Sequence, residues 1–443
     1  MASGRKALFA LAAVGLAAVM FLTGAVTNRQ GDVQSATPQG RGPAGLSVVS
    51  TTGDLSGTIA ALQARLQRVP TDSTAWASLG LAYVQQTRIT GDPSYFAKAD
   101  GVLDRSLEVK PEDNAPALAG MAALAAARHD FAGALRLARQ AHALNEYNSV
   151  SQGMLVDALV ELGRYPQAYR AVEQMVELKP SVPSYTRVSY AFELQGNLDG
   201  ARYAMQRALE TAYSADDKAF ALLQLGELAW NSGDLAGAER HYTAGLELAP
   251  SFVPLLAGQA KVEAASGDTA AALRDYAIVT QQLPQLTYVI EYAQLLSSLG
   301  RDAAAERQYV VVEAQQRLLR SAGVDLDLDL ALYDADRGRV EESLSAARNA
   351  WEARRSVQVE DAYAWALHVN GRDRAAIVHA RAAVAQGTRS ALFAYHRGMV
   401  ELSLGMRDEA QRSLRRALSI NPHFSVLHAP IARRALASLR AGA

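Results

Sequence analysis

The segment Gly233-Asp-Leu-Ala-Gly-Ala238 decides the fold, because the residue types at its two ends recur along nearly the whole chain. A small residue occupies its last position ten times, at intervals of 33–38 residues, which is the period of a helix–turn–helix array. These small residues are Ala99, Ala134, Ala168, Ala201, Ala238, Ala272, Ala305, Ser343, Ala376 and Ala410. The sequence therefore predicts an all-α protein built by repetition.

Other positions repeat in the same register. A bulkier side chain such as Val172 or Tyr242 follows the small residue by one helical turn, so the two share a buried stripe. Proline closes several units, for example at Pro180 and Pro250, where one helix must stop before the next begins. A glycine that fits a tight turn stands five residues before the small residue in Gly163, Gly196, Gly233, Gly267, Gly300, Gly338, Gly371 and Gly405. Each unit then consists of helix A, a turn, helix B and a second turn.

These residues resemble the tetratricopeptide repeat family over roughly residues 72–422. The clearest matches are Trp76-Ala-Ser-Leu79-Gly80-Leu-Ala-Tyr83, and Leu225-Gly226 followed by Gly233 to Ala238 and Pro250. The resemblance implies a right-handed α-solenoid of about ten helix–turn–helix repeats. Two units depart from the pattern. The unit at residues 323–354 lacks the small pair in helix A, and the first unit has an insertion, Gln86 to Ser94, between its helices.

A hydrophobic helix is expected before the array. Residues 7–26 carry no charge and follow Arg5-Lys6, so residues 1–27 are interpreted as a transmembrane anchor or a signal peptide cleaved after Ala25. Both alternatives place the repeats outside the cytoplasm, either on a single-pass anchor in the cytoplasmic membrane or as a secreted protein. Residues 28–54 are expected to form a flexible linker, residues 55–422 the repeat array and residues 423–443 a C-terminal capping helix.

The charge balance and the lack of cysteine restrict the possible partners and the source of stability. The 44 basic and 45 acidic residues give a net charge of -1, which argues against nucleic-acid binding through bulk charge. The chain has no cysteine, so packing alone must stabilise the exported array.

No catalytic, cofactor-binding or metal-binding residue is expected, and the protein is not predicted to be an enzyme. The sequence contains no Gly-rich phosphate loop, His-Glu-x-x-His motif or Gly-x-Ser-x-Gly elbow. Asp325, Asp327 and Asp329 resemble the start of a calcium loop, but Leu330 replaces the required glycine, so Asp325 is interpreted as a helix cap.

A binding surface is expected on the A helices, because the resemblance implies that they line the concave face and hold extended peptides or partner helices. Rings on such a face would supply contact area, and isolated charges would orient the partner. For the tryptophans and tyrosines, core packing is the alternative. The candidate side chains are Asp157, Tyr190, Glu193, Glu227, Trp230, Lys261, Asp361, Trp365, His368 and Tyr395.

The resulting hypothesis is a non-catalytic scaffold or adaptor for proteins or peptides of the bacterial envelope, anchored to the membrane through residues 7–26. The alternative is an enzyme or a secreted ligand-binding protein with its site in the divergent region 323–354. An enzyme should gather titratable groups in one pocket, whereas a scaffold should present an open groove with dispersed charges. The partner and the oligomeric state are left open by the sequence.

Overall fold

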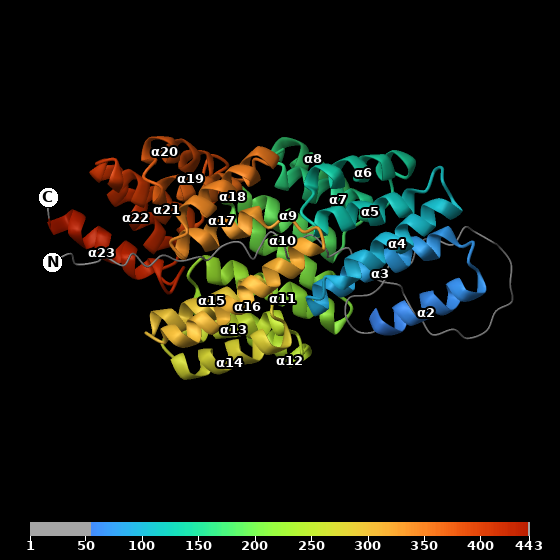
Figure 1. Cartoon of the computed structure of the whole chain (residues 1–443), viewed down its shortest axis with the longest axis horizontal. Coiled ribbons are helices and arrows are strands. Elements are labelled where there is room, and N and C mark those ends of the chain that lie inside the picture. Colours follow the sequence, from blue (N-terminus) through green and yellow to red (C-terminus); the bar gives the residue numbers. More distant parts are fainter. Residues whose placement is uncertain (1–54, 442–443) are drawn as a thin grey trace.

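The computed structural model describes residues 55–441 of the chain (Figure 1). This part of the chain forms twenty-two α-helices and contains no strand. Helices α3 to α22 make ten consecutive pairs, and α2 (Leu55–Arg68) and α23 (His428–Ala441) flank them. The expected all-α solenoid of about ten helix–turn–helix repeats is confirmed.

Each pair consists of a helix A and a helix B that pack against each other. The A helices are α3 (Ser73–Thr90), α5 (Ala115–Ala127), α7 (Ser149–Glu161), α9 (Val182–Leu194), α11 (Ala215–Asn231), α13 (Val253–Ser266), α15 (Leu286–Ser298), α17 (Asp327–Asp336), α19 (Val357–Val369) and α21 (Ala391–Ser403). The B helices are α4 (Ser94–Val109), α6 (Phe131–Leu144), α8 (Tyr165–Leu178), α10 (Leu198–Thr211), α12 (Leu235–Leu248), α14 (Thr269–Gln282), α16 (Asp302–Ser321), α18 (Val340–Ala353), α20 (Asp373–Ala382) and α22 (Arg407–Ile420).

The N-terminal anchor or signal peptide expected at residues 1–27, and the linker expected at residues 28–54, lie outside the described residues. Between residues 55 and 441, no helix combines the length and the apolar character needed to cross a membrane.

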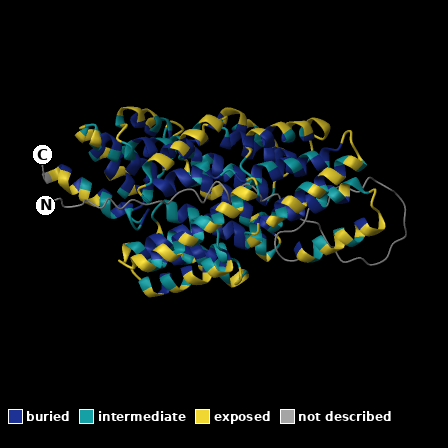
Figure 2. Cartoon of the chain, viewed as in Figure 1, coloured by how far each residue is buried: buried dark blue, intermediate teal, exposed yellow. Residues whose placement is uncertain are grey.

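The small residues of the repeating position are buried in every unit. All ten are at most 1% exposed. Buried residues fill the interior of the array and exposed residues cover its outer surface (Figure 2). Close packing through small side chains therefore sets the repeat.

The turn between helices A and B contains a residue in the left-handed backbone conformation. The eight glycines predicted for this turn all have a positive φ, between 70° and 90°. In the second repeat, His129 takes the same place with a φ of 64°, a conformation that few residues with side chains adopt. In four units the next residue is Asp or Asn, whose side-chain oxygen accepts an N–H group of helix B and caps it: Asp130, Asn197, Asp234 and Asp268.

The two divergent units keep the helical pattern with altered lengths. The stretch from Gln86 to Ser94, expected as an insertion between helices, mostly extends α3 instead, and Gly91 then ends that helix with a φ of 68°. In the other unit, α17 has only 10 residues. Asp325 precedes it, and its Oδ1 accepts the N–H group of Asp327 at 2.9 Å, although Leu326 is the N-cap residue.

The C-terminal helix α23 covers the end of the last repeat. Ala432, Leu436 and Leu439 are buried, whereas Arg433 and Arg440 are exposed. This one-sided pattern is what a terminal helix needs to shield the last apolar surface of an array.

The array coils so far that its second half packs against its first half. Figure 1 shows α17 to α20, in orange, beside the green and cyan helices of the early repeats. The A–B turns of repeats one to five meet the loops that follow repeats six to ten, through hydrogen bonds between residues 191–197 positions apart in the sequence. We call these the inter-turn contacts.

The inter-turn contacts form a regular series. They include Gln285 Nε2 to the Arg88 carbonyl (3.3 Å), Arg128 Nε to the Ala322 carbonyl (3.0 Å), Arg354 Nη1 to Glu161 Oε2 (2.8 Å), Thr388 Oγ1 to the Leu194 carbonyl (2.7 Å) and Asn421 Nδ2 to the Trp230 carbonyl (2.8 Å). Each step advances one repeat in both halves. The two halves are therefore in register along the array.

A shared hydrophobic core supports this arrangement. One cluster joins buried residues of the early repeats, from Leu66 to Leu194, to those of the late repeats, from Val289 to Leu439. Residues of α10 to α14 fall mainly into smaller clusters between neighbouring helices. The middle of the array thus depends mostly on local packing, whereas its ends stabilise each other.

The ion pair between Arg354 and Glu161 tests the inter-turn contacts. Their side chains are only 7% and 3% exposed, so Arg354→Ala leaves a carboxylate without its buried partner. We expect a loss of roughly 3–5 kcal/mol in the free energy of unfolding, measured by urea titration with circular dichroism.

The matched control is Arg105→Ala, which removes the exposed ion pair with Glu108. Exposed pairs of this kind contribute about 0.5 kcal/mol or less. Equal unfolding curves for the two variants would show that the inter-turn pair does not stabilise the fold.

Candidate binding cavity

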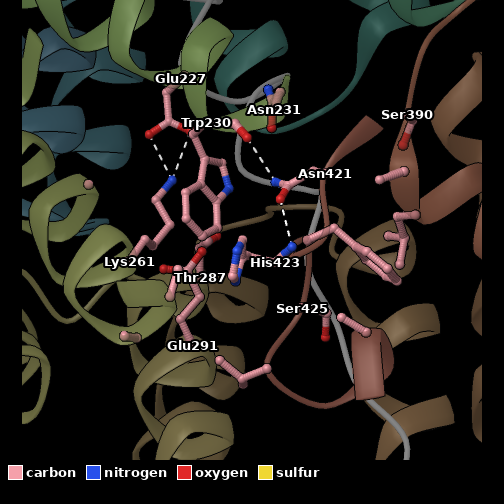
Figure 3. A pocket seen from close by; sticks show the side chains of 18 of the residues that line it. Glu227, Trp230, Asn231, Lys261, Thr287, Glu291, Ser390, Asn421, His423 and Ser425 are labelled. Atoms are coloured by element: carbon pink, nitrogen blue, oxygen red, sulfur yellow. Dashed lines mark hydrogen bonds and ion pairs between the residues drawn. The ribbon is translucent and has the colours of Figure 1, made fainter. Parts of the chain in front are cut away.

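A cavity of about 520 Å³ lies between the two halves of the array (Figure 3). One wall comes from the A helices α9, α11, α13 and α15. The other comes from residues 388–393 and from residues 421–433, which include the loop before α23. The inner face of these repeats is therefore a cavity with two walls rather than a long open groove.

Charged side chains stand at equivalent places on successive A helices. Glu193, Glu227 and Lys261 are each 34 residues apart, on α9, α11 and α13. Lys261 Nζ contacts both carboxylate oxygens of Glu227, at 2.7 and 2.8 Å (Figure 3). Glu291 of α15 adds a third carboxylate to this wall. We call Glu193, Glu227 and Glu291 the acidic cluster.

Tyrosines of the B helices hold two members of the acidic cluster. Tyr242 Oη donates to Glu227 Oε1 at 2.8 Å, and Tyr276 Oη donates to Glu291 Oε2 at 3.2 Å. The Tyr242 ring fits only because Gly226 and Gly258 flank it. A Cβ atom at either position would lie 2.3 or 2.6 Å from that ring. The repeat packing therefore fixes the position of Glu227.

The pKa values of Lys261, Glu193 and Glu291 are shifted, and the causes differ between the lysine and the carboxylates. Burial disfavours the charge of Lys261, but the nearby Glu227 and Glu291 outweigh it and raise its pKa. Burial and the charge of Glu227 raise the pKa of Glu193 to about 7. Burial also raises the pKa of Glu291, although Lys261 opposes this shift. Lys261 thus stays protonated, whereas Glu193 is only partly ionised at neutral pH.

Aromatic rings and carboxamide side chains complete the wall. Trp230 lies beside Lys261, whose Nζ is 5.7 Å from the ring centroid. Tyr190 is 8% exposed and its hydroxyl accepts a hydrogen bond from Gln358 Nε2 at 2.6 Å. The carboxamides of Gln224 and Gln294 also line the cavity; each residue is 4% exposed and, within residues 55–441, neither side chain has a hydrogen-bond partner.

The opposite wall is held by an inter-turn contact. Asn421 donates to the carbonyl of Trp230 and accepts the N–H group of His423 at 2.8 Å (Figure 3). Arg433 from α23 donates to the carbonyl of Pro422. The loop before α23 is therefore fixed against the end of α11 and forms part of the opposite wall of the cavity.

Family comparison agrees with this architecture. Residues 125–188 and residues 393–424 match models of the tetratricopeptide repeat. These two segments are similar to tetratricopeptide repeats. The resemblance of the sequence to this family is confirmed over these two segments, and such repeats generally bind proteins or peptides. No curated protein matches the chain in sequence.

Solved structures of other repeat proteins are similar to parts of the chain. A thermophilic tetratricopeptide repeat protein of Thermus thermophilus shares 21% identity over 37% of this chain and 87% of its own, with a TM-score of 0.34. A tetratricopeptide repeat protein from Parabacteroides merdae shares 18% identity over 58% of this chain and 98% of its own, with a TM-score of 0.34. The Cut9–Hcn1 hetero-tetramer of the APC/C shares 16% identity over 86% and 81%, with a TM-score of 0.43.

The ten side chains expected on the binding surface divide into two groups of five. Tyr190, Glu193, Glu227, Trp230 and Lys261 all line the cavity. Binding by these residues stays a prediction. The sequence analysis did not single out Gln224, Glu291 or Gln294, and residues 388–393 and 421–433 reach the cavity only because the array coils.

The second five side chains lie elsewhere, between neighbouring helices. Asp157 pairs with Arg187 at 2.5 Å, and Asp361 pairs with His396 at 2.8 Å. Trp365 is fully buried and stacks on His396, with 4.2 Å between ring centroids. His368 contacts Asp373 at 2.5 Å, and Tyr395 is also fully buried. These side chains contribute to packing, and a role for them in binding also stays a prediction.

Residues 55–441 contain no group of three or more His, Asp or Glu side chains arranged to hold a metal ion.

The raised pKa of Glu193 predicts a pH effect on stability. The carboxyl binds its proton more tightly in the folded state, so the free energy of unfolding falls as pH rises from about 4.5 to about 7. Glu193→Gln removes this effect. We expect its melting temperature to rise relative to that of the wild type between about pH 5 and pH 8.

The control is Glu239→Gln, the same change at an exposed position of α12. Its melting temperature should follow that of the wild type across the range. If Glu193→Gln behaves in the same way, the Glu193 carboxyl does not titrate as a buried group.

Proposed function

We propose that the array is a non-catalytic scaffold that binds a short extended segment of a partner protein in the cavity. The observation that carries the proposal is the pair of carboxamides of Gln224 and Gln294, which line the cavity and have no hydrogen-bond partner in the described chain. Their donor and acceptor groups are therefore available to a bound molecule. A peptide group offers both the donor and the acceptor that a carboxamide needs.

The other features of the cavity fit a peptide segment. Its volume of about 520 Å³ is within the usual size of ligand sites, about 300–1,000 Å³. Trp230 and Tyr190 provide rigid contact area, and the acidic cluster provides orientation. A cavity between two packed halves favours a short extended segment over a folded domain.

Titratable groups do converge here, which is what an enzyme would also show. However, Lys261 is held protonated by Glu227 and Glu291, so it is a poor nucleophile or base. The divergent unit at residues 323–354, where the enzyme hypothesis placed a site, buries Leu328, Leu330 and Leu332 in the common core. The observations therefore favour binding in the cavity.

The proposal includes a location outside the cytoplasm. Its support is the uncharged stretch at residues 7–26 after Arg5-Lys6, which favours a membrane anchor or an export signal. A tethered scaffold would concentrate its partners at the membrane without chemistry of its own.

Site-specific photo-crosslinking in cells tests this function. The photoreactive residue p-benzoylphenylalanine replaces Thr287 in the cavity wall, or Tyr203, which is 68% exposed on α10. We expect the Thr287 position to give discrete adducts that map to a short segment of one partner or a few. Trp230→Ala should weaken these adducts by at least about tenfold, because it removes the largest ring from the cavity.

Tyr203 serves as the control for general proximity, since it carries the same probe on the outer surface. Adducts that are identical at both positions, or that persist unchanged with Trp230→Ala, would contradict binding in the cavity.

A further inference from the structure

The charges on the cavity wall formed by the A helices are unbalanced around Lys261. Three carboxylates, Glu193, Glu227 and Glu291, share the wall with this single ammonium group. The ammonium group of Lys261 contacts both oxygens of Glu227, so its charge is largely committed to that partner. The acidic cluster therefore has an excess of negative charge in a partly desolvated place.

Glu193 is the member without a partner. Within residues 55–441, no side chain forms an ion pair or hydrogen bond with its carboxylate. Its place on the helix adds to the imbalance, because Glu193 lies in the last turn of α9, where the helix dipole also disfavours negative charge. A cation is the group that would relieve both effects.

Uncharged groups beside Glu193 also favour a cationic donor. Gln358 contacts Tyr190 through its Nε2 atom, while its buried Oε1 has no donor in the described chain. The faces of Tyr190 and Trp230 can pack against the apolar stem of a lysine or the plane of an arginine. The wall thus offers hydrogen-bond acceptors and rings rather than free cations.

We propose that the cavity recognises a basic side chain, Lys or Arg, in the bound segment, and that Glu193 forms the ion pair with it. This inference rests on the proposed function. Arg389 and Arg433 line the opposite wall, so an acidic side chain is the competing occupant that the experiment must separate.

A positional-scanning library of acetylated and amidated pentapeptides is the probe. The full-length chain is immobilised, and retained peptides are quantified by mass spectrometry. We expect pools with Arg or Lys at one position to be retained at least about tenfold more than pools with Gln there, because a desolvated ion pair is worth more than a neutral hydrogen bond. The preference should decrease in about 0.5 M salt, which screens the charges.

Glu193→Gln should reduce this preference to within about twofold while other pools are still retained. Glu239→Gln, with the same change on the outer face of α12, should keep it. Circular dichroism verifies folding, and Glu291→Gln is a second variant that should weaken the preference if Glu193→Gln does not fold.

The outcomes separate the inference from the function. Retention with no basic preference, with an acidic preference, or with a basic preference that survives in the folded Glu193→Gln variant would overturn the inference and leave peptide binding intact. If the wild type retains no pool, peptide binding in the cavity and the inference both fail.

Discussion

The inter-turn contacts determine the shape of this molecule, because they turn a linear array into a closed arrangement of two halves. Tetratricopeptide units ordinarily contact only their neighbours, so the stability of an array is a sum of local terms. Here the A–B turn of each early repeat also meets a loop that lies 191–197 residues further along the chain. One hydrophobic core then includes both ends of the array. The cavity exists because those two halves meet.

The contacts that hold the halves together use groups left over at helix ends. The carbonyls of Leu194 and Trp230 lie in the last turns of α9 and α11, where no further helical turn supplies a donor four residues on, although the Trp230 carbonyl also accepts the N–H group of Gly233 at 2.9 Å. Thr388 and Asn421 donate hydrogen bonds to these carbonyls. These hydrogen bonds therefore cap the ends of the helices that carry Glu193 and Glu227. They also position the opposite wall of the cavity. Closure of the array and construction of the site have one physical cause.

The cavity also shows how repeat packing positions chemistry. Gly226 and Gly258 leave the space that the Tyr242 ring occupies, and its hydroxyl then holds Glu227 against Lys261. Glu193 occupies the equivalent position one repeat earlier but has no such partner in the described chain. The carboxylates of Glu193 and Glu227 occupy equivalent positions in successive units but have different roles. One belongs to the framework of the site, and the other is available to a ligand.

The sequence by itself determined the period, the buried small residues, the left-handed turns and half of the cavity wall. These features depend on contacts within one unit or between adjacent units, and the repeating pattern records such contacts directly. It could not separate Trp230, which lines the cavity, from Trp365, which is fully buried, because both occupy helix A of a similar unit. Only the tertiary structure decided that difference, together with the walls from residues 388–393 and 421–433. Small rotations between successive repeats accumulate along the array, and their sum determines which residues almost two hundred positions apart come together.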